Sequence, residues 1–141
     1  MVNDDSIISS DKSLENIIID SDSASFHKDV IEASKNIPVL VDFWADWCAP
    51  CKQLTPILES AVKYYKGEIR LVKIDSEKNQ DLSKQLQIQS LPTVYAFYEG
   101  QPIDGFSGAM PENEVKDFIK KVIAASGGGK QEEIDKLISE A

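Results

Sequence analysis

Two cysteines, Cys48 and Cys51, stand three positions apart in the stretch FWADWCAPCKQLTP, which covers residues 43–56. Such a pair has four interpretations: half of a zinc site, a structural disulfide, two inert thiols, or a reversible dithiol that passes electrons. A structural zinc site needs four ligands. The chain offers two Cys and one His, His27, which falls in the first predicted helix. Only an intermolecular site could complete that set, so we expect no bound metal and no cofactor.

Composition disfavours a permanent structural disulfide and excludes several kinds of partner. A chain of 141 residues can bury a hydrophobic core that is stable without a disulfide bond. Its net charge of −9 would repel phosphate backbones and anionic lipids. No apolar run approaches the roughly 20 residues of a membrane span, and residues 1–12 lack the basic start and apolar core of a signal peptide. We therefore expect a cytoplasmic monomer that binds neither nucleic acid nor membranes, in a compartment where thiols stay reduced.

A redox dithiol has requirements that the local sequence meets. The attacking species is a thiolate, and a position just before a helix favours an anion, because free N–H groups and the helix dipole point there. Cys48 has that position, and Cys51 lies on the same side of the first turn, where it could resolve a mixed disulfide. Pro50 suits a first helical turn. The pattern therefore predicts redox chemistry.

The rest of the chain must supply the elements that position this pair. Apolar patterns predict strands at residues 16–20, 37–45, 68–75, 92–100 and 101–108. They predict helices at residues 21–36, from the cysteines to Gly67, at 79–88 and at 111–125. Ser21–Ser23 offer caps for the first helix, and Pro111 is expected in the first turn of the last. The order β-α-β-α-β-α-β-β-α predicts an α/β fold with a mixed five-stranded sheet flanked by helices.

The two ends of the chain differ in character from this domain, which we assign to residues 16–125. Residues 1–15 are polar and predict a flexible leader. Residues 126–130 (SGGGK) predict a flexible linker. In residues 131–141, Ile134, Leu137 and Ile138 have helical spacing. This segment is either a frayed tail or the start of a truncated helical-repeat domain.

Further motifs accompany the cysteine pair. Beyond WCAPC, the chain carries VDFWA before the cysteines, KQLTPILE after them, VKID in the third predicted strand, SLPTVYAFYEG, and SGA near residue 108. Together these motifs resemble the thioredoxin family. The resemblance covers roughly Ile17–Ala125 and implies the thioredoxin fold and protein-disulfide reduction. By the same resemblance, Cys48 is the nucleophile and Cys51 the resolving thiol.

Two charged residues in predicted strands acquire roles from this resemblance. Asp42 stands mid-strand among apolar residues, where a buried carboxylate is costly unless it has a task. The resemblance implies that it accepts the proton of Cys51 through water, and burial should raise its pKa, as suits a general base. The alternative is an aspartate facing solvent at a strand edge. Lys73 matches a lysine near that acid in the family, although spacing alone leaves it an ordinary strand lysine.

The resemblance also implies a substrate-binding surface around the dithiol. Pro92 matches a cis-proline that faces the cysteines, Trp47 contributes to the surface, and Trp44 packs beneath. The expected surface consists of Trp47, Ala49, Pro50, Leu91, Pro92, Thr93, Gly108 and Ala109. For Leu91, Thr93, Gly108 and Ala109, a generic core or turn role is the alternative.

Two residues depart from the family pattern. Ala49 stands where a Gly usually follows the first cysteine, and its methyl group should stiffen the loop. Neither residue between the cysteines is His, the feature of strongly oxidising relatives, so we expect a reductant. Asp46 would oppose thiolate formation if its carboxylate pointed inward.

Residues 30–59 and 88–119 look most like the N-terminal domain of bacterial thioredoxins fused to TPR-type helical repeats. Members of that family are described as co-chaperones that combine holdase and redox activity, with a glycine-containing linker before an acidic helix much like EEIDKLISEA. This implies a protein-disulfide reductase that acts on disulfide-containing or unfolded client proteins and is recycled by a thioredoxin reductase. The alternatives are a free-standing general thioredoxin, or a client-binding holdase module with little reductase turnover.

Overall fold

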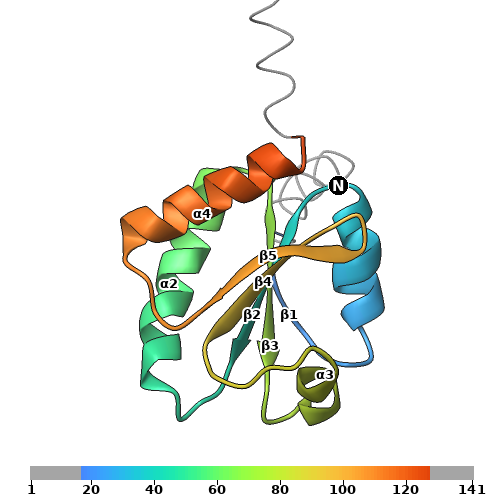
Figure 1. Cartoon of the computed structure of the whole chain (residues 1–141), viewed down its shortest axis with the longest axis vertical. Coiled ribbons are helices and arrows are strands. Elements are labelled where there is room, and N and C mark those ends of the chain that lie inside the picture. The colour runs from blue at the N-terminus through green and yellow to red at the C-terminus, as the bar shows by residue number, and fades with distance from the viewer. Residues whose placement is uncertain (1–16, 128–141) are drawn as a thin grey trace, which may run out of the picture.

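Within residues 17–127, which the computed structural model describes, five strands form one sheet in the order β1-β3-β2-β4-β5 (Figure 1). The strands are β1 (Ile18–Ser21), β2 (Val39–Trp44), β3 (Arg70–Asp75), β4 (Thr93–Tyr98) and β5 (Gln101–Ser107). β3 is parallel to β1 and β2, whereas β4 is antiparallel to β2 and β5. The predicted mixed five-stranded sheet is confirmed. The expected leader, helix 131–141 and most of the expected linker lie outside the described residues.

Helices cover both faces of this sheet (Figure 1). On one side lie α2 (Ala49–Tyr64) and α4 (Glu112–Ala125). On the other lie α3 (Gln80–Gln85) and the first helix, which winds as a π-helix in η1 (His27–Glu32) and as a 3-10 turn in η2 (Ala33–Lys35). The parallel pairing of β2 with β3 requires a crossover, and α2 supplies it.

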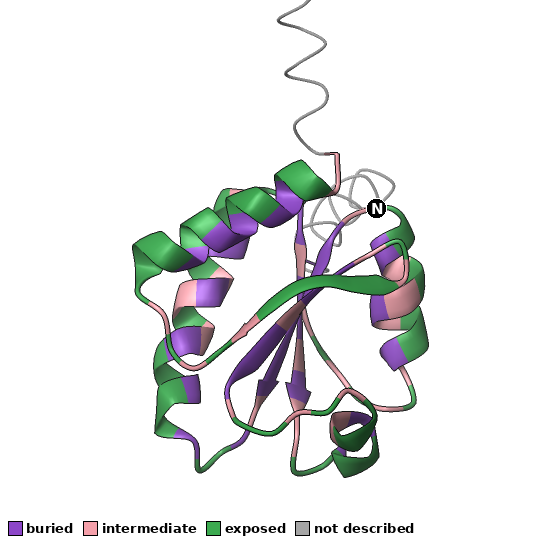
Figure 2. Cartoon of the chain, viewed as in Figure 1, coloured by how far each residue is buried: buried purple, intermediate pink, exposed green. Residues whose placement is uncertain are grey.

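The alternation of side chains along β2 divides the core into two layers. Leu40 packs with Leu54 of α2 and Ile119 of α4, whereas Val41 and its odd-numbered neighbours face the first helix and α3. β2 is therefore buried on both faces, as its apolar run predicts (Figure 2). The α2 face of β2 includes one charged side chain, because Asp42 has the same parity as Leu40.

The first helix begins later than predicted. Its N-cap is Phe26, with no side-chain cap. Ser23, one of the expected caps, instead gives its amide and hydroxyl to Asn79 Oδ1 at 2.9 and 3.1 Å. Asn79 precedes α3, so this serine ties two loops together rather than starting a helix.

Other element boundaries differ by a few residues. α2 ends at Tyr64, three residues before Gly67, and the chain then turns through Lys66 and Gly67, both with positive φ. Pro111 is the N-cap of α4 rather than a residue of its first turn. Glu99 and Gly100 both have positive φ, as a two-residue hairpin turn requires. None of these differences affects the predicted position of the two cysteines at the start of α2.

Candidate active site

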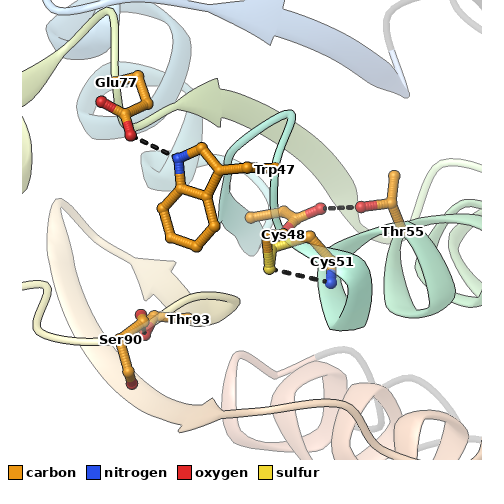
Figure 3. Close-up of a disulfide and its surroundings, with 8 residues drawn as sticks. Trp47, Cys48, Cys51, Thr55, Glu77, Ser90 and Thr93 are labelled. Carbon is orange, nitrogen blue, oxygen red and sulfur yellow. Dashed lines mark hydrogen bonds between the residues drawn. A yellow bond between two sulfur atoms is a disulfide. The ribbon is translucent and has the colours of Figure 1, made fainter.

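The dithiol sits at the start of α2. Cys48 is the N-cap residue, in extended conformation, and Pro50 occupies the first turn. The two cysteines form a disulfide with Cα atoms 5.3 Å apart. The backbone N–H of Cys51 donates to Cys48 Sγ at 3.2 Å (Figure 3). An amide and a helix N-terminus thus point at the sulfur that would carry the negative charge of a thiolate.

The surroundings of the disulfide are mainly apolar. Both cysteines are buried and pack with Ala45, Trp44 and Leu91. Trp47 is instead 67% exposed, and its indole N–H donates to Glu77 Oε1 (Figure 3). The exposed indole ring of Trp47 therefore immediately precedes the buried Cys48–Cys51 disulfide at the start of α2.

Around the disulfide, Asp46, Ala49 and Pro50 are exposed residues. Asp46 is exposed, but it also lines the cavity that Cys51 borders, so its opposition to thiolate formation stays a prediction.

The loop before β4 supplies the other side of this surface. The Leu91–Pro92 peptide bond is cis, and Pro92 accepts a hydrogen bond from the Gly108 amide at 2.9 Å. Ala109, next to Gly108, is exposed. Pro92 and Thr93 are both buried, with Thr93 only 6% exposed, and the Thr93 hydroxyl donates to the Ser90 carbonyl at 2.6 Å. The Thr93 side chain therefore anchors the loop from inside and adds little to the exposed surface.

A row of charged side chains crosses the sheet beneath α2. In the strand register, Asp20 of β1 is paired with Lys73 of β3, and Lys73 is paired with Asp42 of β2. Paired residues of neighbouring strands project to the same face, which here is the face that α2 covers.

The facing side of α2 carries polar residues at every fourth position. Cys51, Thr55 and Glu59 lie on one stripe of the helix. Two contacts join this stripe to the charged row: Thr55 Oγ1 donates to Asp42 Oδ2 at 2.7 Å, and Lys73 Nζ lies 2.9 Å from Glu59 Oε2.

Asp42 is fully buried, which rules out the alternative of an aspartate facing solvent. Its Oδ1 has no hydrogen-bond partner among the described residues. Burial raises the pKa of Asp42 from 3.8 to about 6, although the Thr55 hydrogen bond and the Lys73 charge lower it. The Glu59 charge adds a smaller upward effect. The carboxyl is thus set to exchange a proton near neutral pH.

Lys73 pairs with carboxylates other than Asp42. Besides Glu59, its nearest acid is Asp20, at 3.7 Å. Burial lowers the pKa of Lys73, but the hydrogen bond from Lys73 to Glu59 and the charges of Asp20 and Asp42 outweigh it, so that the pKa is raised. Lys73 therefore stays a cation that acts on Asp42 through its charge.

A cavity of about 320 Å³ opens beside these groups. It is lined by Trp44, Ala45, Asp46, Cys51, Lys52, Thr55, Pro56 and Lys73. The volume is large enough to admit water, and the lining residues include Cys51 together with two neighbours of Asp42. Within residues 17–127, no group of three His, Cys, Asp or Glu could hold a metal ion.

Comparison with known proteins decides the family. The thioredoxin family model matches residues 17–121. A thioredoxin of Rickettsia felis is 40% identical over 100 residues, which cover 71% of this chain and 93% of that protein. The chain belongs to the thioredoxin family. A thioredoxin of Rickettsia conorii is 38% identical over 110 residues, 78% of this chain and all of that protein, and thioredoxin 1 of Synechococcus elongatus is 37% identical over 98 residues, 70% of this chain and 90% of that protein.

With its Cys-X-X-Cys pair at 48 and 51, this thioredoxin is a thioredoxin-type disulfide reductase. Thioredoxins act on disulfide substrates and are reduced by a thioredoxin reductase. No helix within the described range of this thioredoxin is long and apolar enough to cross a membrane.

Three residues of the site, Thr55, Glu59 and Glu77, could not be predicted from the motifs. A signal for the first two was present, since 51, 55 and 59 repeat at the spacing of one helix face. The spacing alone does not identify the partners of Thr55 and Glu59, because these become apparent only when the sheet register places Asp42 and Lys73 under α2. Glu77 lies 30 positions from Trp47, its partner, and no local pattern connects them.

Proposed function

We propose that this thioredoxin reduces disulfides in client proteins by direct exchange at Cys48, with Cys51 as the resolving thiol. The position of Cys48 carries the proposal, because it caps α2 with the Cys51 amide 3.2 Å from its sulfur. That arrangement favours a thiolate at Cys48 over one at Cys51. The exposed Trp47, with Ala49, Pro50, Leu91, Pro92, Gly108 and Ala109, forms the surface on which a client segment docks.

The exchange has two steps. The Cys48 thiolate attacks one sulfur of a client disulfide, whose S–S bond breaks as the Cys48–client disulfide forms, and the leaving client thiolate takes up a proton from solvent. Cys51 then loses its proton and attacks Cys48 Sγ, which forms the Cys48–Cys51 disulfide and expels the second client thiolate. Two electrons pass from the dithiol to the client, and a thioredoxin reductase returns two electrons to the pair.

In the second step, we assign Asp42 as the acceptor of the Cys51 proton. Support comes from its burial, its pKa of about 6 and the cavity that borders Cys51 and Thr55. A carboxylate with that pKa is ionised at neutral pH and can still hold a proton transiently. Lys73 stabilises the ionised form through its charge.

Insulin reduction coupled to a thioredoxin reductase tests the proposal. We expect turnover by the natural sequence, none by Cys48→Ser, and accumulation of a mixed disulfide with the client by Cys51→Ser. Absence of turnover in the natural sequence, together with retained capture by Cys51→Ser, would instead identify a client-binding module.

We further infer that this domain serves as the redox part of a thioredoxin–TPR co-chaperone that acts on unfolded and disulfide-containing clients in the cytoplasm. The sequence resemblance of residues 30–59 and 88–119 supports this, as do the glycine-rich stretch 126–130 and the helical spacing of Ile134, Leu137 and Ile138. The length of the natural gene product tests it. We expect helical repeats to follow residue 141. A reading frame that stops at residue 141 would contradict the co-chaperone proposal and favour a free-standing general thioredoxin.

A further inference from the structure

Asp42 presents two different oxygens to its surroundings. Oδ2 accepts the hydroxyl hydrogen of Thr55 at 2.7 Å, whereas Oδ1 has no partner within the described chain. A buried carboxylate with both oxygens unpaired could turn about its terminal torsion, which is broad for Asp. One strong hydrogen bond removes that freedom, because bonds to ionised groups are shorter and stronger than neutral ones.

Thr55 is linked to both groups of the proposed proton transfer, because it is close to Cys51 on α2 and hydrogen-bonds Asp42. Thr55 lies one helical turn after Cys51 on the same stripe of α2. It also lines the 320 Å³ cavity together with Cys51 and Lys73. Thr55 therefore hydrogen-bonds the buried acid and borders the same cavity as the thiol that must lose its proton.

We propose that Thr55 is a positioning residue, whose hydroxyl occupies Asp42 Oδ2 so that Oδ1 alone is left to receive the proton of Cys51. This inference rests on the proposed role of Asp42 as proton acceptor. It adds a second effect: the donated hydrogen bond stabilises the ionised carboxylate and keeps it ready to accept a proton near neutral pH. Thr55 thereby offsets part of the rise in the pKa of Asp42 that burial causes.

Other charged groups act on the same carboxyl and must be kept constant in any test. The charged residues that face this region are Lys73 from β3, Asp20 from β1, Glu59 and Lys52 from α2, and Asp46 from the loop after β2. From β4, the residue paired with Asp42 is the apolar Val94. Only Thr55 hydrogen-bonds the Asp42 side chain within the described residues, so its substitution isolates one contact.

The first test measures proton binding without any reaction. In the oxidised protein the cysteines do not titrate, and carboxyl ¹³C chemical shifts report Asp42 directly, with Asp42→Asn identifying its signal. Thr55→Val removes the hydroxyl and keeps the branched shape. We expect it to move the Asp42 midpoint upward by about one unit. Thr55→Ser, which keeps the hydroxyl, should restore a midpoint near that of the natural sequence.

The second test measures the resolving step in the reduced protein, by the decay of the mixed disulfide with insulin in rapid-mixing experiments. A midpoint raised by one unit from about 6 leaves about threefold less ionised Asp42 at pH 6.5 and nearly the same amount at pH 8.5. We expect Thr55→Val to resolve about threefold more slowly at pH 6.5 and no more slowly at pH 8.5. Thr55→Ser should follow the natural profile.

An unchanged Asp42 midpoint in Thr55→Val overturns the inference, and so does a raised midpoint with an unaltered pH profile of resolution. Equal loss of rate at both pH values also overturns it, because that result indicates a purely structural role. If Asp42→Asn resolves mixed disulfides with the natural pH profile, the proton-acceptor role fails. The ¹³C titration would still decide whether Thr55 holds the carboxylate.

Discussion

Buried Asp42 should make the oxidised protein less stable as pH rises from 4.5 to 8, and replacement of Asp42 by Asn should remove that contribution. Burial raises the pKa of Asp42 from 3.8 to about 6. Between these values the native state holds a proton that the unfolded chain has released. Stability rises with pH only where the unfolded state binds more protons, so here stability falls.

The size of the effect follows from the shift. About two pKa units, at roughly 1.4 kcal/mol each, give a loss of about 3 kcal/mol between pH values well below 3.8 and well above 6. About two-thirds of that loss falls between pH 4.5 and 8, since the unfolded carboxyl is already largely ionised at pH 4.5. A domain of this size has a total stability of about 5–15 kcal/mol, so the loss is readily measurable.

Urea unfolding of the oxidised protein at closely spaced pH values supplies the measurement. The free energy of unfolding of the natural sequence, minus that of Asp42→Asn, should fall by about 2 kcal/mol from pH 4.5 to pH 8. Any pH-independent cost of the substitution cancels in this comparison. Asp117→Asn, at an exposed position of α4, controls for the loss of one negative charge. Parallel curves for the natural sequence and Asp42→Asn would refute the reasoning.

Three further substitutions test separate parts of the structure. Trp47→Ala should raise the KM for insulin by about tenfold with unchanged unfolding free energy, as expected of an exposed aromatic anchor; Tyr64→Ala, at an equally exposed site on α2, is its control, and an equal effect of both contradicts the docking surface. Ile119→Ala, in the fully buried layer under α4, should cost about 2–5 kcal/mol in urea unfolding, and a loss below about 1 kcal/mol contradicts the packing. Glu59→Gln removes a charge that raises the pKa of Asp42, so the Asp42 midpoint in ¹³C titration should move down, and an upward shift contradicts this assignment.

The fold could be predicted because its decisive signals are local. The apolar run of β2, the CxxC pair before a periodic helix and the two-residue turn between β4 and β5 each lie within one short window of sequence. The predicted start of the first helix was wrong for the opposite reason. Ser23 bonds to Asn79, 56 positions away, and a cap taken by a distant partner leaves no trace in the neighbouring residues.

The site shows the same division between local and distant information. A carboxylate in an apolar strand marks Asp42 as unusual within its own stretch of sequence, because burial of an unpaired charge is costly. Its neighbour Thr55 carries no such mark, since a threonine on a helix usually faces solvent or its own backbone. The hydrogen bond from Thr55 to Asp42 depends on the register of β2 and β3 and on the packing of α2 above them, and neither can be read from the spacing of residues in the helix.

The charged row beneath α2 also explains why one sheet position carries a residue that destabilises the fold. Asp42 lies in the same layer as Leu40 and Leu54, where an apolar side chain would be more stable at neutral pH. The burial that makes the charge costly also brings the pKa of the carboxyl near neutrality, which a carboxylate in water could not reach. Lys73 and Thr55 limit the cost by stabilising the ionised form. The burial that suits Asp42 to the proton transfer we propose thus also lowers the stability of the fold at neutral pH.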